Sequence, residues 1–146
     1  MSSRPIEISP PYWERIKPIP RLEKLRLVLE ILRDYVRVRW LLVRRDLPAV
    51  VAELRRANPV ETDPRLQAIG LRLAHAVRRT LSPLPFDSRC LARSLVLTSV
   101  LSRRGIATTL VIGVAVEPSF AAHAWVESDG VPLLEPLDDE NRLLEL

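Results

Sequence analysis

The single cysteine of this chain lies at the start of a predicted helix, in the stretch SRCLARSLVLTSVL. With Ser88 as the N-cap, Cys90 falls in the first turn, where unpaired backbone N–H groups and the helix dipole stabilise a negatively charged sulfur. If Arg89 and Arg93 point toward the sulfur, their positive charges add to this stabilisation. Because the thiolate is the nucleophilic form, Cys90 is a candidate nucleophile. The alternative is a small buried apolar residue.

His123 is the candidate base that would accept the proton of this thiol. It lies in AAHAWVE, where alternation predicts a strand with His123, Trp125 and Glu127 on one face. A half-buried imidazole there needs hydrogen-bond partners. The other histidine, His75, lies in RLAHAVRR without an acidic neighbour in sequence, and no role is assigned to it.

The turn after this strand predicts an acidic partner for the imidazole. If residues 128–130 form a three-residue loop, Glu127 pairs with Val131, and the same count places His123 opposite Glu135. Glu135 is therefore the candidate that orients the imidazole.

Other arrangements of this hairpin remain open. A two-residue loop at 129–130 would place Pro136 opposite the histidine, which gives the ring nothing to bond. Asp138 and Asp139 are the alternative acids farther along the chain. Glu135 as an exposed strand residue without a catalytic role is the remaining alternative.

A thiol, an imidazole and a carboxylate together form a Cys-His-acid arrangement. In this chemistry His123 holds Cys90 as thiolate and later protonates the leaving amine. Backbone N–H groups at the helix start stabilise the oxyanion. Trp125, on the face of His123, is a candidate wall of the substrate cleft, with an ordinary core tryptophan as the alternative.

Helices precede strands along the chain. Apolar periodicity and the start and stop signals predict helices over residues 21–45, 46–57, 63–81 and 88–105. The first of these has a broad apolar face that includes Leu22, Leu25, Leu29, Leu32, Tyr35 and Val36. The fourth has no charge between Ser94 and Ser102, so we expect it to be buried centrally.

After Gly105 the composition changes to β-branched and alternating residues, followed by an Asp-Gly turn, which predicts a small antiparallel sheet. The predicted fold is α+β, with N-terminal helices packed around a central buried helix and that sheet. We expect a single domain over 1–146, with a Pro-rich arm over 1–20, a helical part over 21–81 and a catalytic core over 82–146.

Composition excludes several classes of protein. One cysteine forms no internal disulfide, and with two histidines it lacks the usual zinc-ligand spacings, so neither a metal nor a cofactor is predicted. The proline-broken N-terminus is not a signal peptide, and arginines interrupt the apolar stretch 22–43, so we predict no membrane span and a cytoplasmic protein.

Charge is unevenly distributed along the chain. Residues 1–57 contain 13 Lys/Arg and 7 Asp/Glu, and residues 58–105 contain 8 Lys/Arg and 3 Asp/Glu. Residues 106–146 contain 1 Lys/Arg and 8 Asp/Glu. The basic part could attract nucleic acid, an acidic peptide or a membrane surface. The arginines are spread around helices rather than collected in a block, which favours solvated helix faces.

The block CLARSLVLTSVLSRRGIATTLVIGV followed by AAHAWVESDG resembles the transglutaminase-like cysteine proteases that mature lasso peptides, the B-type leader peptidases. The resemblance covers about residues 80–136. It implies a transglutaminase/papain-like core, with Cys90 as nucleophile and His123 as base. The third member in that family is usually an aspartate on the next strand, where this chain has Glu135.

The resemblance also implies a substrate and partners. The substrate would be a ribosomally made precursor peptide whose leader is removed before a cyclase closes the ring. This chain resembles the stand-alone form, which acts with a separate small leader-recognition protein. The first helix and its apolar face are then candidate docking surfaces for that protein or for the leader.

Two other functions remain open. The same triad could transfer or deamidate an amide, because water and amines can both accept the acyl group. A non-enzymatic module that grips nucleic acid or an acidic peptide with its basic helices is the third reading, which the absence of a nucleic-acid-binding motif weakens.

Overall fold

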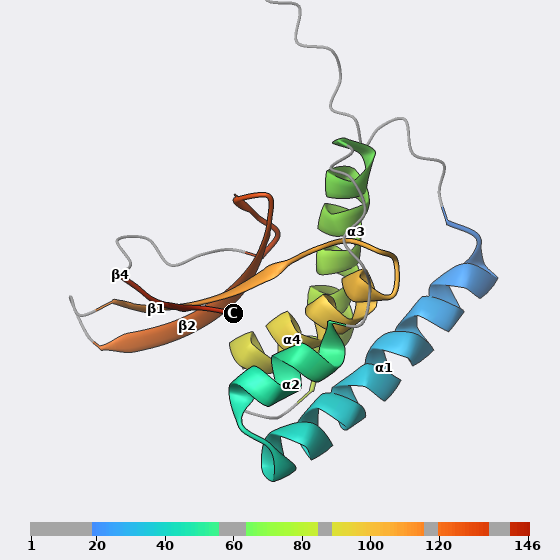
Figure 1. Cartoon of the computed structure of the whole chain (residues 1–146). Helices are drawn as coiled ribbons and strands as arrows, with labels where there is room; N and C mark the ends of the chain where they lie inside the picture. Colours follow the sequence, from blue (N-terminus) through green and yellow to red (C-terminus); the bar gives the residue numbers. More distant parts are fainter. Residues whose placement is uncertain (1–18, 56–63, 85–88, 116–119, 135–140) are drawn as a thin grey trace, which may run out of the picture.

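The computed structural model describes residues 19–55, 64–84, 89–115, 120–134 and 141–146. Within them, helices come first and strands follow (Figure 1). The helices are α1 (Arg21–Arg44), α2 (Leu47–Leu54), α3 (Pro64–Leu81) and α4 (Arg89–Ser102). The strands are β1 (Thr109–Ala115), β2 (Ala121–Ser128), β3 (Val131–Pro132) and β4 (Asn141–Glu145). The predicted α+β fold is confirmed.

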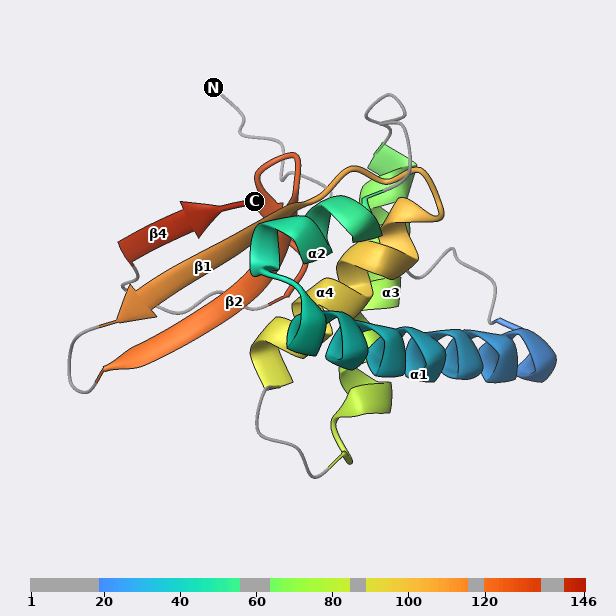
Figure 2. The ribbon, with the colours of Figure 1, turned by 60° about the horizontal axis from the view of Figure 1, so that its bottom comes forward.

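The strands form one antiparallel sheet in the order β3-β2-β1-β4. This sheet lies to one side of the helices (Figure 2). Strand β1 pairs with β2 along its whole length, with Gly113 opposite His123. A bulge follows Ile112 where β1 pairs with β4. The bulge therefore lies next to the position that faces the candidate base, and bulges often occur near active sites.

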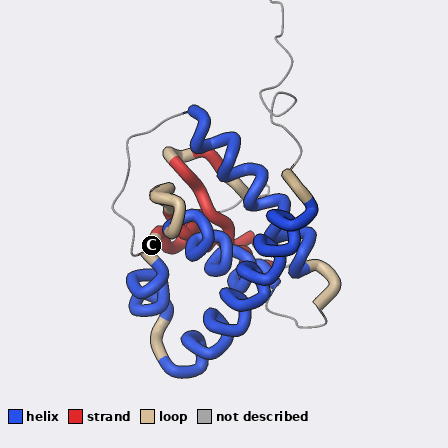
Figure 3. Tube along the Cα trace, turned by 90° about the vertical axis from the view of Figure 1, so that its right-hand side faces the viewer, coloured by secondary structure: helices blue, strands red, loops and turns tan. Residues whose placement is uncertain are grey.

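Helix α4 is the central element of the fold, as predicted. It contacts α1, α2, α3, β1 and β2. Figure 3 shows the helices in front of the strands. Every residue from Ser94 to Ser102 is buried, which agrees with the absence of charge there. Gly105, with φ of +73°, follows the helix in the left-handed conformation that glycine adopts at little cost.

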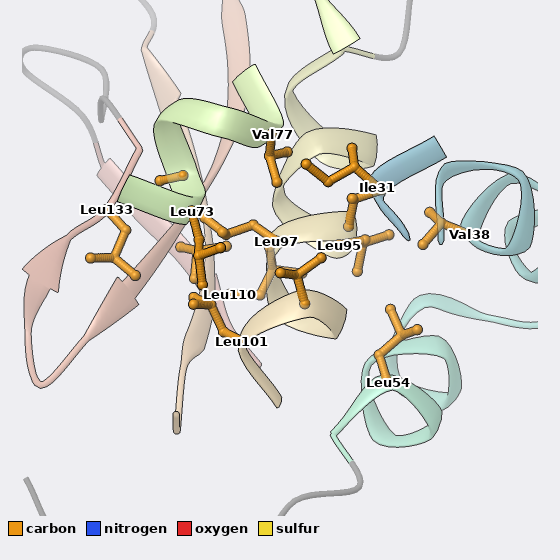
Figure 4. Packing of buried hydrophobic residues seen from close by; sticks show 14 of the residues in the cluster. Ile31, Val38, Leu54, Leu73, Val77, Leu95, Leu97, Leu101, Leu110 and Leu133 are labelled. Carbon is orange, nitrogen blue, oxygen red and sulfur yellow. The ribbon is translucent and has the colours of Figure 1, made fainter. Parts of the chain in front are cut away.

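The hydrophobic core joins the helices to the sheet through one cluster of buried side chains. Leu95, Leu97 and Leu101 of α4 occupy its middle, with Ile31 and Val38 of α1 on one side (Figure 4). Burial of each such side chain contributes roughly 1.5–3 kcal/mol. The central helix is therefore held from several directions, which fixes the position of its first turn.

Helix α1 was expected to have one broad apolar face, and the structure divides its apolar residues between two faces. Ile31, Asp34, Val38 and Leu41 are buried against the rest of the protein. Leu32 and Tyr35, from the predicted face, pack partly against the core. The other four predicted residues are exposed: Leu22, Leu25, Leu29 and Val36. Periodicity located the helix, and packing selected which side is buried.

A buried carboxylate ties α1 to the end of α4. Arg103 forms a two-pronged ion pair with Asp34, whose side chain is 1% exposed, and also bonds Glu30. Arg104 donates to both oxygens of Glu30 at 3.0 Å. Paired charges of this kind compensate the cost of removing a carboxylate from water.

Helix α3 also contacts the segment that follows β3. An added Cβ at Gly70 would lie 3.3 Å from a methyl group of Leu133. A side chain at position 70 would therefore require Leu133 to shift by a few tenths of an ångström. The segment that follows β3 therefore lies directly against α3.

Candidate active site

The candidate nucleophile, Cys90, is the second residue of α4 and is partly exposed. It therefore lies in the first helical turn, as predicted, where backbone N–H groups are not used within the helix. Ser88, the predicted N-cap, lies outside the described residues. The thiol is placed where partial positive charge from the helix favours an anionic sulfur.

The candidate base, His123, lies in the first half of β2 and is partly exposed. The predicted alternation of the strand is reflected in its contacts, because Ala124 and Val126 join the core cluster while Trp125 stacks with His123. The position opposite His123 on β1 is Gly113, which has no side chain to occupy the space beside the imidazole.

Cys90 and His123 line the same pocket, which has a volume of about 130 Å³. Arg78, Arg93, Ala124 and Leu134 complete its described lining. The pocket therefore collects residues from α3, the first turn of α4, β2 and the segment after β3. The two groups that the sequence predicted to act together are brought to one site from separate parts of the chain.

A buried hydrogen bond fixes α4 against β2 beside this pocket. The hydroxyl of Ser94 donates to the carbonyl oxygen of Ala124 at 3.1 Å. Ser94 lies four residues after Cys90, so the two share a helix face. Ala124 directly follows His123. This bond therefore sets how far along β2 the start of α4 lies.

The pocket is positively charged among its described residues. Arg78 and Arg93 line it, and no acidic side chain of the described part of the chain does. Arg93 donates from Nη2 to the hydroxyl of Ser82 at 3.4 Å. Its buried Nε has no hydrogen-bond partner among the described residues. Two guanidinium groups favour anions in the pocket, including a thiolate or the oxyanion of a tetrahedral intermediate.

Trp125 is fully buried and is not among the described residues that line the pocket. Its ring stacks on His123, with 6.1 Å between centroids and 19° between planes. Its Nε1 donates to Glu127 at 2.9 Å. The observed contact therefore restricts the orientation of the imidazole. The predicted role of Trp125 as a wall of the substrate cleft stays a prediction.

The predicted three-residue loop after β2 is wrong. Ser128 pairs with Val131, which leaves a two-residue loop of Asp129 and Gly130. Both loop residues have positive φ, 51° and 74°. An Asp-Gly pair readily adopts positive φ at both positions, and the twist of the resulting two-residue turn matches the twist of the two strands.

The corrected register removes the count that placed Glu135 opposite His123. Glu135 and the alternatives Asp138 and Asp139 lie outside the described residues. The identity of the acid therefore stays a prediction.

The sequence did not single out Arg78 or Leu134 as pocket residues. Arg78 lies in the last turns of α3 and carries no motif that marks it, since charged residues recur throughout that helix. Leu134 reaches the pocket only because the segment after β3 packs beside α3. His75, to which no role was assigned, is exposed on α3 and is not among the described lining residues.

Among the residues that the structure describes, no three His, Cys, Asp or Glu side chains gather as a metal site would require. None of the described helices is both long enough and apolar enough to cross a membrane.

Comparison with known proteins agrees with this arrangement of a buried helix against a small sheet. No curated protein and no solved structure matches the chain significantly. Residues 32–145 match the family described as the transglutaminase-like superfamily, which generally contains cysteine-dependent enzymes. The matched part includes all of α4 and the four strands, and with them Cys90 and His123. The match supports an activity of the cysteine protease or acyl transferase type. The chain belongs to the transglutaminase-like superfamily.

Proposed function

We propose that the protein is a cysteine endopeptidase that removes the leader from a ribosomally made lasso precursor peptide. The observation that carries this proposal is that Cys90 and His123 line one pocket at the start of α4. Membership of the transglutaminase-like superfamily supports cysteine chemistry. The choice of a lasso precursor rests on the resemblance of residues 80–136 to B-type leader peptidases.

In the proposed reaction, the Cys90 thiolate attacks the carbonyl carbon of the scissile peptide bond. Backbone N–H groups at the start of α4 stabilise the oxyanion. His123, protonated by the thiol, then gives its proton to the leaving amine as the C–N bond breaks. Water hydrolyses the resulting thioester, with His123 accepting a proton from it, and the leader leaves with a new carboxylate.

An acidic side chain completes the proposed triad by orienting His123. Glu135 is retained for this role, with Asp138 and Asp139 as alternatives. We expect Glu135→Gln to lower kcat/KM less than His123→Ala does, because an orienting group is easier to replace than a base. If Asp138→Asn lowers kcat/KM more than Glu135→Gln does, Asp138 is the orienting acid.

The proposed setting is a cytoplasmic biosynthetic assembly. The partners are the precursor peptide, a separate small protein that recognises its leader, and the lasso cyclase that uses the released core. No cofactor or metal takes part, because the thiol, the imidazole and backbone N–H groups supply every step.

Amide transfer or deamidation is the alternative activity, and the family match supports it equally. It would form the same thioester on Cys90 from a side-chain amide and release ammonia. The two activities differ in product, because transfer leaves the peptide chain intact.

The test is incubation of the protein with its precursor peptide and the recognition protein, followed by mass spectrometry. We expect a leader-sized mass loss with the wild-type protein and none with Cys90→Ala, which removes only a small, partly exposed side chain. Circular dichroism would verify that the variant is folded. Cleavage by Cys90→Ala at the wild-type rate would reject the proposal. A mass change that fits replacement of a side-chain NH2 group by OH or by an amine, with the peptide chain intact, would establish the alternative.

A further inference from the structure

The outward side of α1 carries a row of large apolar side chains that no described part of the chain covers. Each is more than half exposed, with exposed fractions from 51% to 85%. The row consists of Leu22, Leu25, Leu29, Val36, Trp40 and Val43, and is called the α1 stripe below. Single exposed apolar residues are ordinary, whereas six of them on one side of a helix mark an interaction surface.

The α1 stripe lies opposite the buried side of the same helix. That buried side contains Ile31, Asp34, Val38 and Leu41. At about 100° per residue, the centres of the two sets lie about 180° apart around the helix axis. The core therefore accounts for one apolar side of α1 and leaves the other without a structural role.

The spacing of the α1 stripe is that of a helix-pairing seam. Leu22, Leu29, Val36 and Val43 recur every seven residues, and Leu25 lies three residues after the first of them. The six side chains of the stripe fall within about 60° around the axis, whereas a broad apolar face covers about 100° or more. The stripe is about 32 Å long. A narrow, straight seam fits one α-helix better than it fits a lipid surface.

The charged side chains beside the α1 stripe are all basic. Those within about 80° of its centre are Arg21, Arg26, Arg33, Arg39 and Arg44. All five are exposed, and the guanidinium group of Arg44 lies 4.3 Å from the ring centroid of Trp40. Residues that flank a helix-pairing seam select the partner by charge. A complementary partner therefore has acidic residues beside its own apolar seam.

This charge pattern disfavours a second copy of the same chain. Two α1 stripes placed together would bring arginines against arginines in either the parallel or the antiparallel orientation, and like charges across an interface oppose pairing. Within α1, no acidic side chain lies beside the stripe to relieve this repulsion.

We propose that the α1 stripe binds an amphipathic α-helix of another polypeptide, with apolar residues at heptad spacing and acidic residues on both flanks. The binding surface lies on α1, whereas the pocket with Cys90 uses α3, α4 and the sheet. The inference therefore does not depend on the proposed peptidase activity, and its test measures binding alone.

The probe is a synthetic peptide of about four heptads with Leu at positions a and d and Glu at e and g, and a second peptide has Lys in place of Glu. Binding to the full chain is measured by calorimetry. We expect the Glu peptide to bind the wild-type protein and the Lys peptide to bind at least about tenfold more weakly. Leu29→Asp with Val36→Asp should weaken binding of the Glu peptide about tenfold or more.

Two further variants sharpen this test. Leu71→Asp is the matched control, because Leu71 is a similarly exposed leucine on α3, and it should bind as the wild type does. Arg26→Glu with Arg33→Glu should reverse the preference, so that the Lys peptide binds more tightly. All of these changes are at exposed positions, and circular dichroism would verify the fold of each variant.

Four results would overturn the proposal. Equal binding of the Glu and Lys peptides would show that the partner is not selected by acidic residues. Undiminished binding by Leu29→Asp/Val36→Asp would show that the α1 stripe is not the binding surface. Self-association in sedimentation experiments that this double variant abolishes, without binding of the Glu peptide, would assign the stripe to a second copy. Binding to phosphatidylglycerol vesicles that the double variant loses, again without peptide binding, would assign it to a lipid surface.

Discussion

Arg93 lies three residues after Cys90 on α4, so its guanidinium group stands over the same side of the helix as the thiol. Its buried Nε lacks a hydrogen-bond partner among the described residues, and the side chain lines the pocket. A charge held in this position is available to an anion that enters the pocket. Arg78 adds a second guanidinium group from α3.

This charge predicts how Cys90 reacts with small reagents. Iodoacetate carries a negative charge and iodoacetamide does not, so their rate ratio reports the local potential. We expect Arg93→Met to lower the ratio of the iodoacetate rate to the iodoacetamide rate about threefold or more. The reason is that the anionic iodoacetate is no longer attracted by the guanidinium group of Arg93. Arg93→Lys should retain most of the ratio. The single cysteine makes mass spectrometry of the whole chain sufficient.

The matched control for this measurement is Arg79→Met, which removes an exposed arginine of α3 that is not among the described lining residues. It should leave the ratio unchanged. If Arg79→Met and Arg93→Met change the ratio equally, the effect comes from net charge and not from the pocket.

At the scale of elements, the sequence predicted the four helices and strands β1 to β3, because apolar periodicity, alternation and end signals are local. It did not predict β4, Asn141–Glu145, which pairs with β1. Helix α3 begins at the predicted Pro64, and α4 ends before the predicted Gly105. The buried side of α1 was harder to predict, since two opposite sides of that helix are apolar. Only the packing of α1 against α4 decides between them.

The register of the hairpin formed by β2 and β3 was also not determined by local sequence. The sequence located the Asp-Gly turn, but a loop of two or three residues changes every cross-strand partner that follows. The strand twist favoured the shorter loop. One residue of difference therefore removed the basis for pairing Glu135 with His123.

The bond between Ser94 and Ala124 predicts a positioning effect. We expect Ser94→Ala to lower kcat of precursor cleavage about tenfold with little change in KM, because Cys90 shifts relative to His123. Stability should fall by about 1–2 kcal/mol, since the carbonyl oxygen of Ala124 loses its buried donor. The measurements are steady-state kinetics and urea unfolding.

Thr98→Val is the control, because the Thr98 hydroxyl donates to the carbonyl oxygen of Ser94 within α4. It should cost stability without lowering kcat. Equal losses of kcat in the two variants would attribute the effect to general loosening of α4.

The ion pairs between α1 and α4 predict a pH-dependent stability. Burial raises the pKa of Glu30, but hydrogen bonds and charges from Arg104 and Arg103 outweigh it and hold that pKa below its usual 4.5. A depressed carboxylate pKa stabilises the fold above the unfolded pKa and loses this effect as pH falls through the folded value. The contribution of these pairs is therefore complete at neutral pH.

We expect Arg103→Met to destabilise the protein by about 3 kcal/mol at pH 7, because it leaves the buried Asp34 carboxylate without its main partner. The difference from wild type should shrink as the pH falls below 4.5, because Glu30 then protonates and its pairs with Arg103 and Arg104 are lost. Urea unfolding at several pH values measures it. Arg33→Met is the control, since Arg33 is largely exposed at 4.0 Å from Asp34, and it should change stability by less than about 0.5 kcal/mol. A constant difference across this pH range would contradict the account.

At the scale of the whole molecule, the candidate site exists only because distant parts of the chain meet. The sequence predicted Cys90 and His123 because their types and surroundings carry chemical information. It did not predict Arg78 and Leu134, which reach the pocket through the packing of α3 and of the segment after β3. Residues whose role comes from tertiary position leave no local pattern.

The most direct test of the central claim asks whether His123 activates the thiol of Cys90. The measurement is the rate of Cys90 alkylation by iodoacetamide at pH 7 in the wild-type protein, His123→Gln and His75→Gln. We expect His123→Gln to slow alkylation about tenfold, because the variant lacks the proposed acceptor of the thiol proton. His75→Gln changes the only other histidine, which is exposed on α3, and should react as the wild type does. An unchanged rate in His123→Gln would contradict the account.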